Sequence, residues 1–153
     1  MEKNIKEIAD LVNDKISTAY LTLNDYVSTE NMIPMFGGIH PSTVLPKYNV
    51  TSFQTGDILL SNIRPYFKKM WLANFNGGCS NDVLVIRVKK DFINNKYLFY
   101  ALSNDSFFAN YVSSCKGTKM PRGNKDTLLN WKIDIPNLKQ QQHIVDTRGG
   151  HAS

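Results

Sequence analysis

Two short segments of this chain combine cations, aromatic rings and neutral hydrogen-bonding groups at a spacing that suits a negatively charged ligand. The first segment reads SNIRPYFKK and spans residues 61–69. Its arginine can bind a phosphate through two hydrogen bonds or lie against a guanine edge, and its proline lowers the entropy lost when a loop binds. Its tyrosine adds a hydroxyl and its lysines add point charges. The candidate contact residues in this segment are Arg64, Tyr66, Lys68 and Lys69.

The second segment reads KGTKMPRGNK and spans residues 116–125. Its glycines permit a close approach of the backbone to a ligand, and its neutral side chains add hydrogen bonds to those of its cations. The candidate contact residues here are Lys116, Thr118, Lys119, Arg122 and Asn124. Asn62 and Ser80 are weaker candidates, whereas Gly56 and Gly117 are expected to serve turn geometry.

The distribution of charge indicates a polyanionic partner more strongly than the total charge does. The 18 Lys and Arg residues against 13 Asp and Glu residues give a formal net charge of +5. No acid occurs between Asp57 and Asp82, or between Asp105 and Asp126, and each of these stretches contains one of the two basic segments. The alternative is that both segments are ordinary solvated loops.

The sequence favours binding over catalysis. Its acids are spread singly, without the clustered carboxylates that a Mg²⁺-dependent nuclease needs, and it has neither a phosphate-binding loop nor a nucleophile elbow. The order from Asn62 to Tyr66 lacks the first proline of the Asn-Pro-Pro-Tyr loop of amino-methyltransferases. Two cysteines and three histidines show no metal-ligand spacing, so Cys79 and Cys115 are expected to be buried, unpaired and inert.

Length and hydropathy predict a single domain in the cytoplasm. With 153 residues, 42% of them hydrophobic and 20% charged, the chain can bury a sizeable core. No apolar run approaches the roughly 18 residues of a membrane span, and the N-terminus lacks the apolar stretch of a signal peptide. We therefore expect no contact with a membrane.

The N-terminal part predicts strands separated by irregular segments. The apolar spacing predicts a short helix over 5–12, and residues 20–27 have strand-like alternation. Residues 35–49 are rich in Gly and Pro and predict a loop. Further strands are expected over 58–60, 70–75 and 82–88, and Asn76-Gly77-Gly78 predicts a turn that joins the last two in a hairpin. Phe67 and Trp71 are expected to be buried.

The C-terminal part predicts helices with an aromatic core face. Two helices are expected over 95–115, with Asn94 and Ser103 or Asn104 as N-caps. Asp126 is expected to cap a short helical turn, followed by a strand in WKIDIP. A last helix begins after Pro136 and is expected to end by Gly149-Gly150.

Three ordered sequence blocks resemble the target-recognition domain of a type I restriction–modification specificity subunit. The blocks are G-D-I-L-x-S-x-I-R-P, then K-G-T-x-x-P-R, then I-P-x-L-x-x-Q-Q-x-I-V, and together they span about residues 55–146. Each block is weak by itself, but the ordered set is specific. Residues 1–54 match less clearly, as expected for the part that varies with the target sequence.

The resemblance implies a small α+β fold, with a twisted, mostly antiparallel sheet and packed helices. It implies that residues 1–146 form one non-catalytic domain that reads one half of a bipartite site in double-stranded DNA. Modification and restriction subunits would be its partners, with a second recognition domain or half-subunit. S-adenosylmethionine, Mg²⁺ and ATP would be used only by those partners. Residues 147–153 depart from the pattern and predict a disordered tail without the family's spacer helix.

Two other functions remain open from the sequence. A truncated recognition domain could be a decoy that binds a modification subunit through the Tyr- and Phe-rich helices over 95–115. Alternatively, Tyr66, Trp71 and Phe75 could stack on the bases of a single-stranded nucleic acid.

Overall fold

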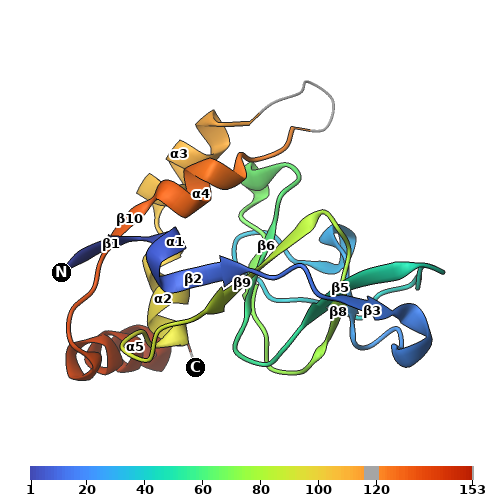
Figure 1. Ribbon diagram of the computed structural model, residues 1–153, viewed down its shortest axis with the longest axis horizontal. Coiled ribbons are helices and arrows are strands. Elements are labelled where there is room, and N and C mark those ends of the chain that lie inside the picture. Colours follow the sequence, from blue (N-terminus) through green and yellow to red (C-terminus); the bar gives the residue numbers. More distant parts are fainter. Residues whose placement is uncertain (116–120, 153) are drawn as a thin grey trace.

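The chain folds into small β-sheets with helices gathered at one end, as a computed structural model that describes residues 1–115 and 121–152 shows (Figure 1). The central sheet has the order β2-β9-β6-β7 and is antiparallel throughout. A second sheet has the order β3-β5-β8-β4, in which only β4 and β8 run parallel, and β1 pairs with β10. The expected α+β class, with mostly antiparallel sheets and packed helices, is confirmed.

The strands of the described residues are β1 Glu2–Asn4, β2 Ala9–Leu11, β3 Lys15–Ser17, β4 Tyr26–Val27, β5 Asn49–Phe53, β6 Ile58–Ser61, β7 Met70–Leu72, β8 Gly77–Cys79, β9 Val83–Val88 and β10 Lys132–Asp134. The helices are α1 Ile5–Ile8, α2 Asn95–Leu102, α3 Asp105–Ser113, α4 Lys125–Asn130 and α5 Leu138–Ala152. Short 3₁₀ turns lie at η1 Thr18–Tyr20, η2 Thr29–Asn31 and η3 Pro65–Phe67.

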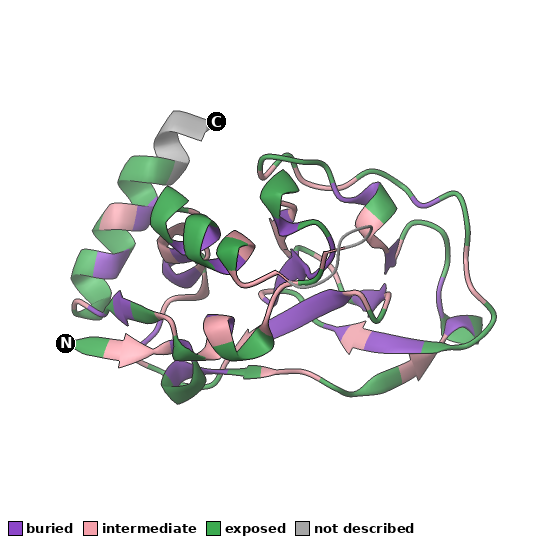
Figure 2. Cartoon of the chain, turned by 90° about the horizontal axis from the view of Figure 1, so that it is seen from above, coloured by how far each residue is buried: buried purple, intermediate pink, exposed green. Residues whose placement is uncertain are grey.

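The central sheet is buried on both faces because it separates two apolar clusters. Alternate residues of a strand point to opposite faces. Ile58 and Leu60 of β6 accordingly join the helices in the larger cluster, while Leu59 joins the second sheet in the smaller one. Figure 2 shows the buried positions concentrated along the central strands and the inner faces of the helices. This explains why β6 reads as a continuous apolar run.

Asparagine caps begin the helices that cover the larger cluster. The Asn94 side chain accepts hydrogen bonds from the first turn of α2, and the Asn104 side chain accepts one from Phe107 N in α3 at 2.7 Å. These caps satisfy backbone donors that lack a partner inside the helix. The predicted helices and caps are therefore confirmed, with Asn104 as the second N-cap.

Three predictions for the N-terminal part are wrong. The first helix ends at Ile8, because the extended backbone at Ala9 starts β2 and pairs with β9. Only the end of the strand-like stretch 20–27 is a strand, since Asp25 holds Thr22 in a turn. Strands β7 and β9 form no hairpin, because β6 lies between them and β8 joins the other sheet.

Two predictions near the C-terminus also need correction. Asn124, not Asp126, caps α4, since its side chain accepts a hydrogen bond from Asp126 N at 2.8 Å. Helix α5 continues to Ala152, so the double glycine at 149–150 does not end it and residues 147–152 are helical. Glycine weakens a helix by roughly 1 kcal/mol relative to alanine but does not block one.

Candidate nucleic-acid interface

The two basic segments, separated in the sequence by residues 70–115, lie side by side in the fold. Ile63 and Arg122 form an antiparallel bridge, and Arg64 N donates a hydrogen bond to Pro121 O at 2.8 Å. Figure 1 shows the η3 turn next to the strand-like segment that leads into α4. The fold therefore unites the described parts of both segments on one edge of the molecule.

A buried anchor holds this junction in place. The Asn62 side chain is buried and accepts a hydrogen bond from the Tyr111 hydroxyl of α3. Its backbone carbonyl accepts a second bond from Gly123 N at 3.0 Å. A β-carbon at Gly123 would lie 2.2 Å from the Tyr111 ring, so only glycine fits there. Burial raises the pKa of the Tyr111 hydroxyl, which stays protonated and can donate. Asn62 is therefore positioned as a structural anchor.

The η3 turn is fixed at both ends by residues in the left-handed backbone region. Arg64 has φ 48° and Lys68 has φ 53°, values that non-glycine residues seldom adopt. Phe67 N donates to Arg64 O and Lys68 N donates to Pro65 O, each at 3.0 Å. Such strained residues persist where the surrounding structure over-determines them, and they gather at ligand-binding sites.

A second strained turn, over residues 33–38, is bonded to the first. Met35 with φ 55° and Phe36 with φ 60° complete the left-handed non-glycine residues in the described part of the chain. Met35 N donates to Phe67 O at 2.9 Å and Phe36 N donates to Lys68 O at 3.0 Å. All four strained residues thus belong to one pair of joined turns. Nothing in the sequence pattern indicates that this second turn belongs to the site, although Pro34 and the two glycines that follow predict a loop.

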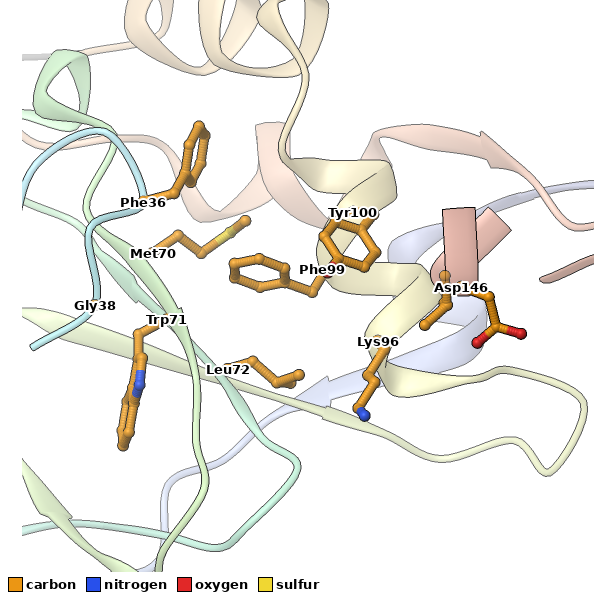
Figure 3. A pocket seen from close by; sticks show the side chains of 10 residues that line it. Phe36, Gly38, Met70, Trp71, Leu72, Lys96, Phe99, Tyr100 and Asp146 are labelled. Carbon is orange, nitrogen blue, oxygen red and sulfur yellow. The ribbon is translucent and has the colours of Figure 1, made fainter. Parts of the chain in front are cut away.

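The Phe36 ring anchors the second turn on the helices. It packs edge-on against Phe108 at a centroid distance of 5.4 Å and against Phe99 at 6.5 Å. Figure 3 shows Phe36, Met70 and Phe99 around a shared cleft between β7 and α2. The cleft has apolar and aromatic walls, with Lys96 and Asp146 on its α2 and α5 side. Phe36 therefore holds the second turn against α2 and α3 at the wall of this cleft.

Arg64 and Tyr66 are presented to solvent. Both side chains are exposed, and neither makes a hydrogen bond or an ion pair with any side chain or backbone group of residues 1–115 and 121–148. The Tyr66 ring lies against the Phe67 ring, with 4.8 Å between centroids. Of the predicted contact residues that the structure describes, these two have exposed side chains without a hydrogen-bond or ion-pair partner in the described part of the chain.

The two lysines of the first segment have partners inside the chain. Lys68 Nζ lies 3.1 Å from Asp105 Oδ1, an exposed carboxylate that salt screens. Lys69 Nζ donates to Thr29 O at 2.7 Å and lies 5.7 Å from the centroid of the Phe67 ring. Both lysines add positive charge to the junction, but Lys69 also ties η2 to it.

The second segment divides its side chains between an ion pair and a cap. Arg122 Nη1 lies 2.6 Å from Asp82 Oδ1, so an acid from outside the basic segments offsets this cation. Asn124 caps α4 and its backbone N–H donates to Ser114 Oγ at 3.3 Å. The predicted positions Lys116, Gly117, Thr118 and Lys119 lie outside the described residues.

Two predictions concern the aromatic side chains: the burial of Phe67, and a stacking platform that includes Trp71 and Phe75. The expected burial of Phe67 is wrong, since 40% of its surface is exposed because η3 turns it toward Tyr66 and away from the core. Trp71 and Phe75 are half-buried and pack on Phe53, with ring centroids 5.8 and 5.7 Å from it. These two rings stabilise the smaller apolar cluster and do not form a continuous stacking platform with Tyr66.

Burial also decides the state of the thiols. The expected burial is confirmed for Cys79, and it raises the pKa of that thiol to about 12. It is wrong for Cys115, which is only half-buried, although partial burial raises the pKa of this thiol as well. Among the described residues, no three His, Cys, Asp or Glu side chains gather as a metal site. In the same part of the chain, no helix has the length and apolar character to cross a membrane.

Comparisons with known proteins point in one direction. Residues 1–147 match the family described as type I restriction modification DNA specificity domain. The specificity subunit of the type I restriction enzyme EcoDI from Escherichia coli is 36% identical over 95 residues, which cover 61% of this chain and 20% of that subunit.

Solved structures share the fold. The HsdS subunit from Thermoanaerobacter tengcongensis superposes with a TM-score of 0.77 at 23% identity, covering 98% of this chain and 41% of that one. A structure from a study of complex assembly and conformational transition of the type I R-M system has a TM-score of 0.79 at 23% identity, covering 99% and 42%. The chain thus spans a fifth of the curated relative and less than half of either solved chain.

Proposed function

Because the chain belongs to the family of type I restriction modification DNA specificity domains, we propose that it recognises a base sequence in double-stranded DNA and contributes no catalysis. The junction of η3 with residues 121–124 is the contact surface. One observation carries this assignment: the fold joins two acid-free basic segments through the Ile63–Arg122 bridge and leaves Arg64 exposed beside it.

The roles of the contact residues follow from their surroundings. Arg64 presents an exposed guanidinium on a rigid turn, so it is the residue best placed for two hydrogen bonds to a guanine edge or a phosphate. The remaining described cations, Lys68, Lys69 and Arg122, have partners within the chain. We assign them to phosphate contacts, to which they add positive potential. Lys116, Thr118 and Lys119 belong to the same sequence segment as Arg122 and are further candidate contacts.

The finer proposal is that this chain reads one part of a bipartite site. It spans less than half of the solved specificity chains that it resembles, which leaves length for a second recognition unit in such proteins. Modification and restriction subunits of a type I complex would then act on the DNA. S-adenosylmethionine, Mg²⁺ and ATP would serve those subunits.

The test is fluorescence anisotropy with a randomised DNA duplex at low and at physiological salt. We expect binding that weakens steeply with salt, because phosphate contacts release counterions. Arg64→Ala should lower the affinity about tenfold or more, which corresponds to about 1–3 kcal/mol for a bidentate contact. An Arg64→Ala/Arg122→Ala double variant should bind more weakly still.

A charge-matched control separates a local contact from a general loss of charge. Lys139 is exposed on α5, which lies apart from the junction in Figure 1, and Lys139→Ala removes the same charge. We expect this variant to bind like the wild type. Equal binding by the wild type and the arginine variants at low salt would remove the junction from the interface.

A further inference from the structure

Three exposed apolar side chains belong to the joined turns. Met35, Tyr66 and Phe67 are 64%, 46% and 40% exposed. The bond from Met35 N to Phe67 O brings the turns together, and the Tyr66 and Phe67 rings are in contact. We call these three residues the apolar tip. Isolated exposed apolar residues are common, but a cluster on a binding surface indicates a contact.

The backbone beneath the apolar tip is held rigidly. Met35, Arg64 and Lys68 all adopt left-handed angles, and Phe36 fixes the second turn by packing against Phe108. Side chains on such a backbone lose little conformational freedom when they meet a ligand. A flexible loop would give the same residues a weaker contact, so the rigid support favours a role in recognition.

Cations surround the apolar tip. Arg64 precedes Tyr66 on η3 with an exposed guanidinium, and the Lys69 ammonium lies over the Phe67 ring. Lys68 closes the turn on the other side. Apolar side chains flanked by cations are the pattern with which proteins wedge between base steps while holding the phosphates on either side. This charge favours a nucleic acid over an uncharged protein surface as the occupant.

We propose that the apolar tip inserts between two stacked base pairs of the bound duplex, with Arg64 holding the adjacent backbone or base edge. This inference rests on the proposed function and adds a mode of specificity to it. Insertion separates stacked bases, so binding should favour sequences in which that separation costs little, such as pyrimidine–purine steps. Part of the specificity would then come from the deformability of the DNA.

The test compares a randomised duplex with the same duplex carrying a central C·C mismatch, which is already partly unstacked. Binding is measured by anisotropy for the wild type, for Tyr66→Ala and for a Met35→Ala/Tyr66→Ala double variant. We expect the wild type to prefer the mismatched duplex about tenfold, because the mismatch removes most of the unstacking cost. The double variant should lose this preference and keep its salt dependence.

Arg64→Ala is the matched comparison within the same turn. It should weaken binding to both duplexes and flatten the salt dependence while keeping the preference for the mismatch. A 2-aminopurine placed beside the mismatch reports insertion directly, since its fluorescence rises when it is unstacked. Thermal unfolding of each variant checks that the exposed substitutions leave the fold intact.

The outcomes separate this inference from the proposed function. Equal binding of both duplexes by the wild type, with unaltered binding by the double variant, would overturn insertion and leave DNA recognition standing. Absence of wild-type binding to either duplex would overturn both. If the double variant keeps the mismatch preference and loses binding to a modification subunit, the apolar tip is a protein contact and insertion is wrong.

Discussion

Asp57 and Arg64 belong to the same sequence block, G-D-I-L-x-S-x-I-R-P, but the fold uses their charges in opposite ways. Asp57 is 3% exposed and accepts two hydrogen bonds from Arg87, at 2.9 and 2.8 Å, and a third from Gln54 N at 2.8 Å. Arg64 is exposed on a strained turn, and its guanidinium has no hydrogen-bond or ion-pair partner in the described residues.

The difference shows that one motif can contain both a buried structural residue, which we call a brace, and an exposed ligand-contact residue, which we call a contact. The first half of the block holds the chain at the entrance to β6: Gly56 has φ 93°, and its carbonyl accepts a bond from the Asn95 side chain at 3.1 Å. The second half leaves the sheet and presents η3 to solvent. Substitutions in the brace should therefore affect folding, whereas substitutions in the turn should affect binding.

Removal of the buried carboxylate should have the largest effect. Asp57→Ala leaves the Arg87 guanidinium half-buried without its partner and the Gln54 N–H without an acceptor. We expect the free energy of unfolding to fall by about 3 kcal/mol, as for other buried pairs that lose one member. Urea-induced unfolding, followed by circular dichroism, measures this change.

Two controls define the comparison with the turn. Asp91→Ala removes an exposed acid and should change the stability by less than about 0.5 kcal/mol. Arg64→Ala should be as stable as the wild type while binding DNA more weakly. If Arg64→Ala unfolded as readily as Asp57→Ala, the division between brace and contact would be wrong.

A second brace should have the next largest effect. Gln141 is fully buried in α5 and accepts a bond from Asn94 N at 2.8 Å, while its amide donates to Phe92 O and Pro136 O. Gln141→Leu leaves three partly buried backbone groups without their Gln141 partner, so we expect a loss of about 2 kcal/mol in unfolding free energy. Gln142→Leu, at an exposed position, should cost less because water replaces its hydrogen bonds. Equal losses would show that Gln141 is not a brace.

The ion pair between Asp82 and Arg122 allows a test by gain of positive charge at the junction. Asp82→Asn removes the acid that holds Arg122 and so increases the positive charge of the junction. We expect affinity for a randomised duplex to rise about threefold at low salt and the salt dependence to steepen by about one released counterion. Asp91→Asn, distant in sequence from both basic segments, is the matched control. Unchanged or weaker binding by Asp82→Asn would exclude Arg122 from the contact surface.

The smallest effect is expected at the thiols. The buried Cys79, with a pKa raised to about 12, stays protonated at about pH 8 and should not react with a thiol reagent in the folded chain. The half-buried Cys115 should react slowly, because its pKa is also raised. Cys115→Ser should therefore abolish labelling of the folded chain, and denaturation should expose Cys79. Rapid labelling of Cys79 would contradict its packing in the smaller cluster.

Local patterns predicted much of the secondary structure. Apolar strands such as β6 and β9, and helices with asparagine caps such as α2 and α3, follow from periodicity and from side chains that bond to their own backbone. The pairing of strands did not follow, since β6 lies between β7 and β9 although Asn76-Gly77-Gly78 indicates a local hairpin. A turn signal describes a bend in the chain and not the strand that becomes its neighbour.

The candidate site divides in the same way. Residue types alone pointed to Arg64 and Tyr66, which the fold leaves exposed. They gave no sign that Asn124 is a cap or that Asp82 pairs with Arg122, because these partners depend on how the chain folds. Met35 joins the site only through a backbone hydrogen bond to Phe67.

The sequence by itself determined the identity of the two basic segments and of the ordered blocks that resemble a DNA specificity domain, and that resemblance implied the α+β class. The segments and blocks depend on composition and order along the chain, which need no knowledge of distant contacts. Only the tertiary structure decided that the two segments meet at Ile63 and Arg122, which cations are paired, and which aromatic rings face solvent. The physical reason is that ion pairing and burial are set by residues far apart in sequence, and these are brought together only when the core forms.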